Sequence, residues 1–284
     1  MTPKNLVAVR LSGGLGNQMF SYAVGLALAQ RLNGDLRFDT RHFRNPHVRP
    51  SQLSAFGIKV REWTPVWWRA EAAVRKISGG RWRPGPTRLI ERSDFEPEVM
   101  HVSAPCYLKG YFQSWRYLHG AEDVVRAAFD TGRLSTTQTA PMEARIAQAE
   151  CPVMVHVRRG DYTRPPQTYA LLEINHYERA RSRLSLSGTR PTYFLFSDDP
   201  IAATAMLKHW PDVVPVPGYS NLEDFRLMSL CRHFIIANSS FSWWAAWLGG
   251  AADKQVIAPN IWFAQPGGRA VDLDARLPPS WTRV

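Results

Sequence analysis

Cysteine and long apolar runs are the features that this 284-residue chain has least of. It contains three cysteines, an odd number at wide spacing, which excludes a disulfide framework and a CxxC metal site. No apolar run approaches the ~20 residues of a membrane-spanning helix. Residues 1–5 show no basic, apolar or cleavage-site region of a signal peptide. We therefore expect a protein of the reducing cytoplasm.

Positive charge is what the chain has in excess, with 35 Lys and Arg, 24 Asp and Glu, and a net charge of +11. Nine basic and three acidic residues lie between Lys59 and Arg92, together with four tryptophans. Basic residues interleaved with tryptophan suit an anionic membrane surface, so peripheral contact of 60–92 with the inner face of the cell membrane is one hypothesis. A solvated basic helix with inward-packed tryptophans is the alternative. Because the charge is concentrated in one segment, we expect no nucleic-acid partner.

Strand-like and helix-like segments alternate along the chain, which predicts right-handed β-α-β crossovers and parallel sheets of an α/β protein. The expected strands are 6–11, 36–39, 107–112, 153–158, 192–197, 213–216, 233–237 and 255–258. The expected helices are 17–32, 175–186, 200–209, 221–231 and 241–248. A polar stretch at 137–141 precedes a short polar helix. We expect two domains, 1–145 and 146–284, with ligands at the strand C-termini facing a cleft.

The first candidate site follows the predicted strand 153–158, where two arginines, a glycine and Asp161 stand together. Strand alternation places His156 and Arg158 on one face and the valines on the other. Arg159 would then point away from Arg158, unless the strand has already ended. Adjacent guanidinium groups suit a phosphate or carboxylate. Solvated arginines at a strand end are the alternative.

Two further strand ends carry polar groups. Ser197, Asp198 and Asp199 follow the second apolar strand of this half. These carboxylates suit either hydrogen bonds to a nucleobase or ribose, or the N-cap of the next helix. The serines of Asn238-Ser239-Ser240-Phe241-Ser242 open a helix, which favours a phosphate site, although capping alone would account for one serine.

The fourth candidate is the turn Ser12-Gly13-Gly14-Leu15-Gly16-Asn17-Gln18. It lacks the full GxGxxG spacing and an acidic residue at the ribose-binding distance, which disfavours a dinucleotide-dependent dehydrogenase. HExxH and EF-hand patterns are absent. If the ligand is a nucleotide sugar and no metal is bound, the diphosphate that leaves the sugar must be stabilised by arginine side chains and helix dipoles. The chain has candidates for both.

The blocks Ser12–Phe20, His156–Tyr162, Phe196–Asp199 and Ser239–Trp244, in this order, resemble the α-1,2-fucosyltransferases of glycosyltransferase family 11. The resemblance implies a GT-B fold, with two Rossmann-like domains facing a cleft. The C-terminal domain would bind GDP-fucose and the N-terminal domain the acceptor. It also implies an enzyme that needs no metal or other cofactor and transfers L-fucose, with inversion, to the 2-hydroxyl of a β-galactosyl acceptor. That acceptor would be an oligosaccharide or lipid-linked glycan, such as the O-antigen that bacterial members build. Another linkage or another GDP-sugar is the alternative.

The resemblance also implies roles for individual residues. Arg158 would hold the β-phosphate, His156 would lie over the guanosine, and Asp198 or Asp199 would recognise the guanine edge. Asp161 would activate the acceptor hydroxyl or fix the arginines; another carboxylate, or no dedicated base, is the alternative for the activation. The catalytic candidates are Arg158, Asp161 and Asn17. The substrate-binding candidates are His156, Arg159, Tyr162, Gly14, Gly16, Gln18, Ser197, Asp198, Asp199, Asn238, Ser239, Ser240 and Phe241.

Overall fold

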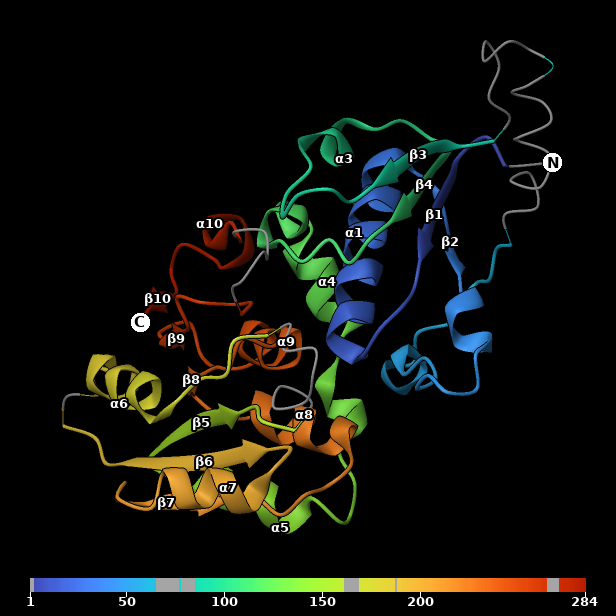
Figure 1. Ribbon diagram of the computed structural model, residues 1–284. Helices are drawn as coiled ribbons and strands as arrows, with labels where there is room; N and C mark the ends of the chain where they lie inside the picture. Colours follow the sequence, from blue (N-terminus) through green and yellow to red (C-terminus); the bar gives the residue numbers. More distant parts are fainter. Residues whose placement is uncertain (1–2, 65–76, 78–84, 161–168, 187, 265–270) are drawn as a thin grey trace. The chain divides into compact units, whose positions relative to one another are not determined.

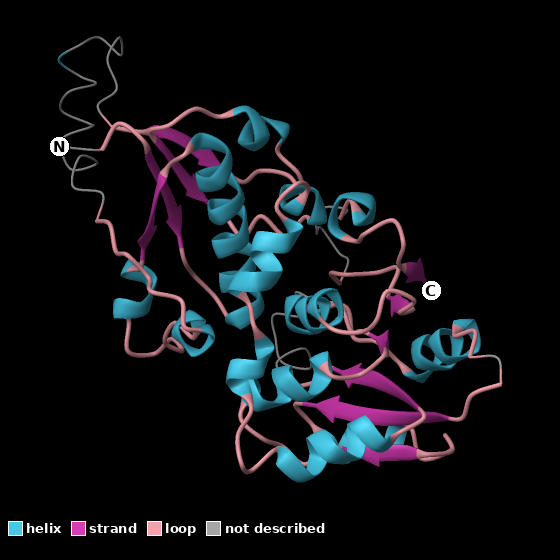
Figure 2. Ribbon diagram, turned by 180° about the vertical axis from the view of Figure 1, so that it is seen from behind, coloured by secondary structure: helices cyan, strands magenta, loops and turns pink. Residues whose placement is uncertain are grey.

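The computed structural model describes residues 3–64, 77, 85–160, 169–186, 188–264 and 271–284. These residues form two compact units, Met1–Ala128 and Phe129–Val284 (Figure 1). Each unit has a parallel sheet and helices between its strands (Figure 2). The α/β class expected from the alternating pattern is therefore confirmed.

The first unit contains a four-stranded sheet of order β2-β1-β4-β3, in which every pairing is parallel. Its elements are β1 (Leu6–Arg10), α1 (Leu15–Leu32), β2 (Asp35–Asp39), η1 (Arg41–Arg44), η2 (Leu53–Phe56), β3 (Thr87–Ile90), α3 (Pro97–His101), β4 (Cys106–Lys109), η3 (Trp115–Leu118) and α4 (Glu122–Ala128). Helix α1 packs on the sheet through the apolar face expected from its sequence, with Met19, Phe20 and Val24 buried and Ala27 half-buried.

The second unit contains a six-stranded parallel sheet of order β10-β9-β8-β5-β6-β7. Its elements are η4 (Thr131–Leu134), α5 (Ala140–Gln148), β5 (Cys151–Val157), α6 (Ile174–Arg183), β6 (Pro191–Ser197), α7 (Pro200–Met206), β7 (Val213–Pro215), α8 (Asn221–Ser229), β8 (His233–Ile235), α9 (Ser240–Leu248), β9 (Val256–Ala258), α10 (Leu273–Arg276) and β10 (Thr282–Arg283).

Strand β5 lies in the middle of this sheet and is buried on both faces. Val153, Val155 and Val157 belong to one core cluster, as strand alternation predicted. Met154 and His156, on the other face, are also buried. A central parallel strand covered on both sides explains the continuous apolar run that ends at Val157.

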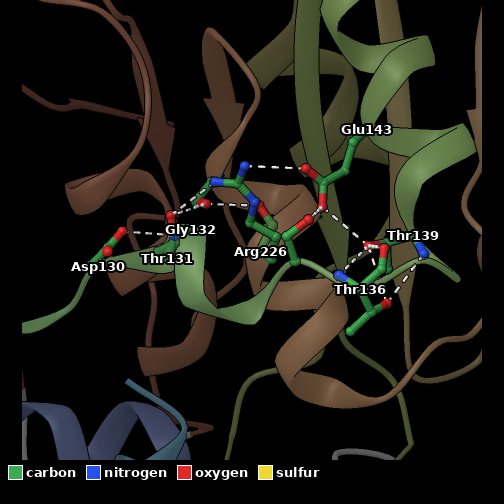
Figure 3. A network of polar contacts seen from close by, with 9 residues as sticks. Asp130, Thr131, Gly132, Thr136, Thr139, Glu143 and Arg226 are labelled. Carbon is green, nitrogen blue, oxygen red and sulfur yellow. Dashed lines mark hydrogen bonds and ion pairs between the residues drawn. The ribbon is translucent and has the colours of Figure 1, made fainter. Parts of the chain in front are cut away.

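The division between the units lies closer to the N-terminus than the boundary expected between residues 145 and 146. A polar network ties the segment after Phe129 to α8, all within the second unit (Figure 3). Arg226 of α8 donates to Glu143 of α5 at 3.1 Å and to Thr131 at 3.3 Å. The Thr136 hydroxyl donates to Glu223 of α8 at 2.7 Å. These contacts make residues 129–145 part of the second unit.

Each sheet has a point at which the strand order reverses. In the second unit the chain runs from β5 through β6 to β7 and then returns to β8 on the other side of β5. In the first unit β2 and β4 lie on opposite sides of β1. In open α/β sheets, ligands bind beyond the carboxyl ends of the strands at these reversals. The residues after β5 and β8, and those after β1 and β4, therefore stand where a ligand is expected.

The segment 60–92 lies mostly outside the described residues, so membrane contact through it stays a prediction. Of its four tryptophans only Trp63 is described, and its ring packs beside Tyr107, with Leu6 and Ala8 in the same cluster. No described helix combines the length and apolar character required to cross a membrane.

Candidate active site

One carboxylate from the end of β6 holds the two arginines that follow β5. Asp198 Oδ2 lies 3.2 Å from Arg158 Nε. The backbone N–H of Arg159 donates to Asp198 Oδ1 at 2.8 Å. The side chains of Arg158 and Asp198 are 29% and 23% exposed, so solvent screens this pair less than a fully exposed one. The carboxylate therefore sets the direction of the Arg158 guanidinium at the edge where a ligand would bind.

Gly160 is required for this arrangement because it approaches the same carboxylate closely. A Cβ atom at Gly160 would lie 2.5 Å from Asp198 Oδ2 and 3.1 Å from its Cγ. Real Cβ atoms do not come that close to an oxygen, so any side chain here would displace Asp198. The Arg-Arg-Gly block thus requires glycine at this position because the Asp198 carboxylate occupies the space of a side chain.

His156 is the last residue but one of β5 and is 4% exposed. Its ring centroid lies 6.3 Å from that of Phe241, at the start of α9. Its Nδ1 makes no hydrogen bond within the part of the chain that the structure describes. Burial and the nearby charge of Arg158 lower the pKa of His156 to about 3. The imidazole is therefore neutral at physiological pH.

The second carboxylate of the Asp198-Asp199 pair caps a helix. Asp199 accepts a hydrogen bond from the Ala202 N–H at 3.1 Å at the start of α7, and its own N–H donates to the Ser197 hydroxyl at 3.0 Å. For Asp199 the capping alternative is therefore confirmed. Asp198 holds the chain after β5, and recognition of the guanine edge by either carboxylate stays a prediction.

The residues after β8 divide into a buried anchor and a half-buried helix start. Asn238 is 1% exposed, and its amide donates to the carbonyl oxygens of Ala170 at 2.9 Å and Trp262 at 2.7 Å. Ser239 is the N-cap of α9 and accepts from the Phe241 N–H at 3.3 Å. Asn238 therefore positions two loops, and capping accounts for one serine. No acidic residue occurs in the first turn of α9, which leaves the positive end of its dipole uncompensated by the helix itself.

In the first unit, the turn after β1 depends on glycine and leads into α1. Gly13 has φ +75°, and a Cβ there would lie 2.6 Å from the amide nitrogen of Asn17. Gly14, the exposed N-cap of α1, faces open space, whereas Gly16 is buried. Gln113, after β4, donates to Asn17 Oδ1. The pairing joins the loops after β1 and β4.

Gln18 is fully buried and holds this turn against a distant loop. Its amide nitrogen donates to the Gly13 carbonyl at 2.9 Å. Its amide oxygen accepts from the Ser51 hydroxyl at 3.1 Å and the Gln52 N–H at 3.0 Å. We therefore assign Gln18 a positioning role instead of the direct substrate contact expected from the sequence.

The structure also adds residues that the sequence motifs did not reveal. Glu91, after β3, accepts from the backbone N–H groups of Tyr111 and Phe112, each at 2.7 Å. Tyr111 is 40% exposed, and its ring lies beside Gly13. In the sequence, Tyr111 is marked only as an aromatic residue shortly after β4, and nothing around Glu91 indicates its contacts.

The chain contains one DxD triplet, Asp272-Leu273-Asp274, a pattern that can hold a divalent ion for a nucleotide sugar and therefore bears on the expectation of metal independence. Asp272 caps α10 by accepting from the Ala275 N–H at 3.0 Å, and Asp274 pairs with Arg283 at 2.9 Å. Both carboxylates thus have structural contacts. Within the described ranges, no group of three or more His, Cys, Asp or Glu side chains has the arrangement of a metal site.

Three of the four sequence blocks thus meet at the carboxyl edge of the second sheet. Asp198 joins the ends of β5 and β6, and the contact between His156 and Phe241 joins the end of β5 to α9. Asp161 and Tyr162 lie outside the described residues, so their roles stay predictions. The fourth block stands at the corresponding edge of the first sheet.

The sequence model described as "Glycosyl transferase family 11" matches residues 86–282, more than half of the chain. The chain belongs to glycosyl transferase family 11. An Escherichia coli alpha-1,2-colitosyltransferase is 27% identical to it, over 99% of each chain. A Mus musculus galactoside 2-alpha-L-fucosyltransferase, Sec1, is 26% identical over all of this chain and 75% of the relative. The family 11 chain is thus a glycosyltransferase.

The fold is similar to that of a solved fucosyltransferase. The crystal structure of the NodZ alpha-1,6-fucosyltransferase soaked with GDP-fucose superposes with a TM-score of 0.53 at 19% identity, over 86% of this chain and 93% of NodZ. At this identity the likeness concerns the fold alone. With the two parallel sheets, it confirms the GT-B class.

The glutamine that positions the glycine-rich turn before α1 gives a prediction about stability. Gln18→Leu leaves Gly13 O, Ser51 Oγ and Gln52 N without this partner, so we expect the free energy of unfolding to fall by about 2–3 kcal/mol. Urea unfolding followed by tryptophan fluorescence measures the change. Gln30→Leu, at an exposed position of the same helix, is the matched control and should change it by less than about 0.5 kcal/mol. Equal effects of the two substitutions would contradict the positioning role.

The buried His156 gives a prediction about acid sensitivity. The unfolded imidazole takes up a proton near pH 6.5, whereas the folded one stays neutral down to about pH 3. Between these values the unfolded chain binds more protons, so the free energy of unfolding falls with falling pH, by about 2 kcal/mol from this group between pH 6.5 and 5. His156→Gln should remove that part of the pH dependence, measured as urea midpoints at several pH values. His209→Gln, at an exposed position of the same unit, should leave it unchanged. An identical pH slope in wild type and His156→Gln would show that the histidine is not held neutral.

Proposed function

We propose that this glycosyltransferase is an inverting, metal-independent α-1,2-fucosyltransferase that moves L-fucose from GDP-fucose to the 2-hydroxyl of a β-galactosyl acceptor. The observation that carries the proposal is the fixed guanidinium of Arg158 at the point where the order of the second sheet reverses. The similarity to a galactoside 2-alpha-L-fucosyltransferase supports the donor sugar, the acceptor class and the linkage.

The chemistry of sugar transfer explains why that guanidinium matters. The bond from the sugar to the diphosphate breaks, and negative charge develops on the departing phosphate oxygen. Arg158, oriented through Nε by Asp198, would place its positive charge at that oxygen. The N-terminus of α9, with no acidic residue in its first turn, would add its backbone N–H groups and its dipole.

The nucleoside would lie beside His156 and Phe241. The neutral imidazole adds no charge to the guanosine pocket, so Arg158 supplies the charge for the diphosphate. The half-buried Phe241 ring offers an apolar surface for the flat base. Asn238 would act indirectly, by holding the loops at Ala170 and Trp262 in place.

The acceptor would bind at the corresponding edge of the first unit. The turn at Gly13 and Gly14, the amide of Asn17 and the exposed ring of Tyr111 stand there together. An exposed aromatic ring packs well against the C–H face of a galactose. Inversion requires that the acceptor hydroxyl lose its proton on the face opposite the leaving group. Asp161 is the candidate base, and its alternative role is to fix the arginines.

Transfer of colitose is a second candidate function. The alpha-1,2-colitosyltransferase matches this chain end to end and carries the same linkage in its name. The fixed Arg158 suits any sugar linked to a nucleoside diphosphate, so the donor sugar decides between the two functions. Incubating the enzyme with lactose and with GDP-linked fucose or colitose in turn, and identifying the product linkage by NMR, distinguishes them. Comparable transfer of both sugars would contradict selectivity for fucose.

The donor assignment predicts a large difference between two neighbouring arginines. Arg158→Ala should lower the turnover of GDP-fucose by about 100-fold or more, because a group that stabilises developing charge is lost. Arg159→Ala, which keeps the backbone N–H bonded to Asp198, should lower it much less. Release of GDP in single-turnover experiments measures both, and urea unfolding verifies that both variants fold. Turnover near that of wild type in Arg158→Ala would refute the assignment.

Metal independence is a further prediction of this mechanism. Transfer from GDP-fucose to lactose should keep its full rate in excess EDTA, because the phosphate charge is met by Arg158 and α9. Rates with EDTA, and with added Mg²⁺ or Mn²⁺ after its removal, test this. If activity were lost with EDTA and restored by a cation, the DxD triplet at Asp272 and Asp274 would become the first candidate site.

A further inference from the structure

A pocket of about 300 Å³ lies in the first unit, and Ser51, which donates to Gln18, is part of its lining. Its lining is mixed: Phe43 and Ile58 give apolar surface, and Thr40, Arg44, Ser54 and Glu62 give polar groups. The volume is at the lower end of the range for small-molecule sites, about 300–1,000 Å³.

The pocket is at the carboxyl edge of the first sheet. Thr40 directly follows β2, which pairs with β1 along its whole length. The 3-10 helices η1 and η2, drawn in light blue in Figure 1, supply residues of its walls, and η2 packs against α1. The turn that precedes α1 occupies the same edge after β1. A chain of sugars entering over β1 would therefore extend towards the pocket.

Gln18 connects the pocket wall to the family's glycine-rich turn. Its amide oxygen accepts from Ser51, a residue of the lining, and from Gln52, which precedes η2. Its amide nitrogen holds the Gly13 carbonyl. One buried side chain thus fixes both the turn and the pocket, which explains why an amide without solvent contact stands in the block that resembles the family.

The lining has the chemistry of a sugar site. A pyranose ring has an apolar C–H face and a rim of hydroxyl groups. The half-buried ring of Phe43 suits the C–H face. The Thr40 hydroxyl, which donates to Glu62 at 2.8 Å, presents a polar pair for sugar hydroxyl groups, and the exposed Ser54 and Arg44 add further hydrogen-bonding groups.

We propose that this pocket binds the sugar residue of the acceptor next to the galactose that receives fucose, and so sets acceptor choice. This inference rests on the proposed function. A minimal galactoside would be held at the Gly13 turn alone, whereas a longer acceptor would also fill the pocket between η1 and η2.

The test blocks the pocket and compares acceptors of different length. Ser54→Trp should raise the KM for lactose and longer β-galactosides about ten-fold, while the KM values for methyl β-galactoside and GDP-fucose change by less than about two-fold. Phe43→Ala should shift the same acceptors in the same direction. Ser103→Trp is the matched control, since Ser103 is exposed in the same unit but precedes β4, at the amino edge of the sheet. It should change no KM.

Equal effects of Ser54→Trp on methyl β-galactoside and on the longer acceptors would overturn the inference, as would no effect on either. If no GDP-sugar is transferred to any β-galactoside, the proposed function fails, and saccharide binding still tests the pocket. In saturation-transfer NMR with the same oligosaccharides and no donor, protons of the second sugar should give signals in wild type and Ser103→Trp but not in Ser54→Trp. Unchanged or absent signals would overturn the inference separately.

Discussion

The contact between Asp198 and the chain after β5 is the interaction on which the candidate donor site depends. The carboxylate comes from the end of β6 and orients both the Arg158 guanidinium and the Arg159 backbone. It can do so because β5 and β6 pair in register, with Val157 opposite Ser197, which brings the residues that follow them together. Gly160 leaves the space that the carboxylate occupies. The register of β5 and β6, the ion pair with Asp198 and the space at Gly160 together fix the position of the Arg158 guanidinium.

The first unit reaches a similar result with a neutral group. There the buried amide of Gln18, instead of a carboxylate, links loops that leave different strands. An amide both donates and accepts, so one side chain satisfies a carbonyl and two donors without adding charge. At the edge proposed for the acceptor, the neutral Gln18 holds the turn and the Glu91 carboxylate holds the loop after β4, whereas the edge proposed for the anionic donor is organised around arginine.

Most strands and several candidate site residues could be predicted from the sequence. The strand and the contacts that could not be predicted have physical reasons. Apolar runs placed β5 and β6 correctly because these strands are buried along most of their length. Strand β3 was missed, since Thr87–Ile90 is largely exposed and lacks an apolar signal. The predicted strand ends identified the candidate residues, but the sequence did not predict their hydrogen-bond partners. Asp198 and Arg159 are 39 residues apart, and Gln18 and Ser51 are 33 apart. Contacts at such separations depend on sheet order.

Sheet order also explains why a neutral histidine can stand beside a permanent cation. The charge of Arg158 acts on His156, so protonating the buried imidazole would set a second positive charge near the first with little solvent to screen it. Burial removes that proton and leaves Arg158 as the defined charge at this point. In the proposed function, a diphosphate bound there would meet a guanidinium already held by Asp198 and a helix start without acidic residues. Little electrostatic reorganisation would then be required when the nucleotide departs.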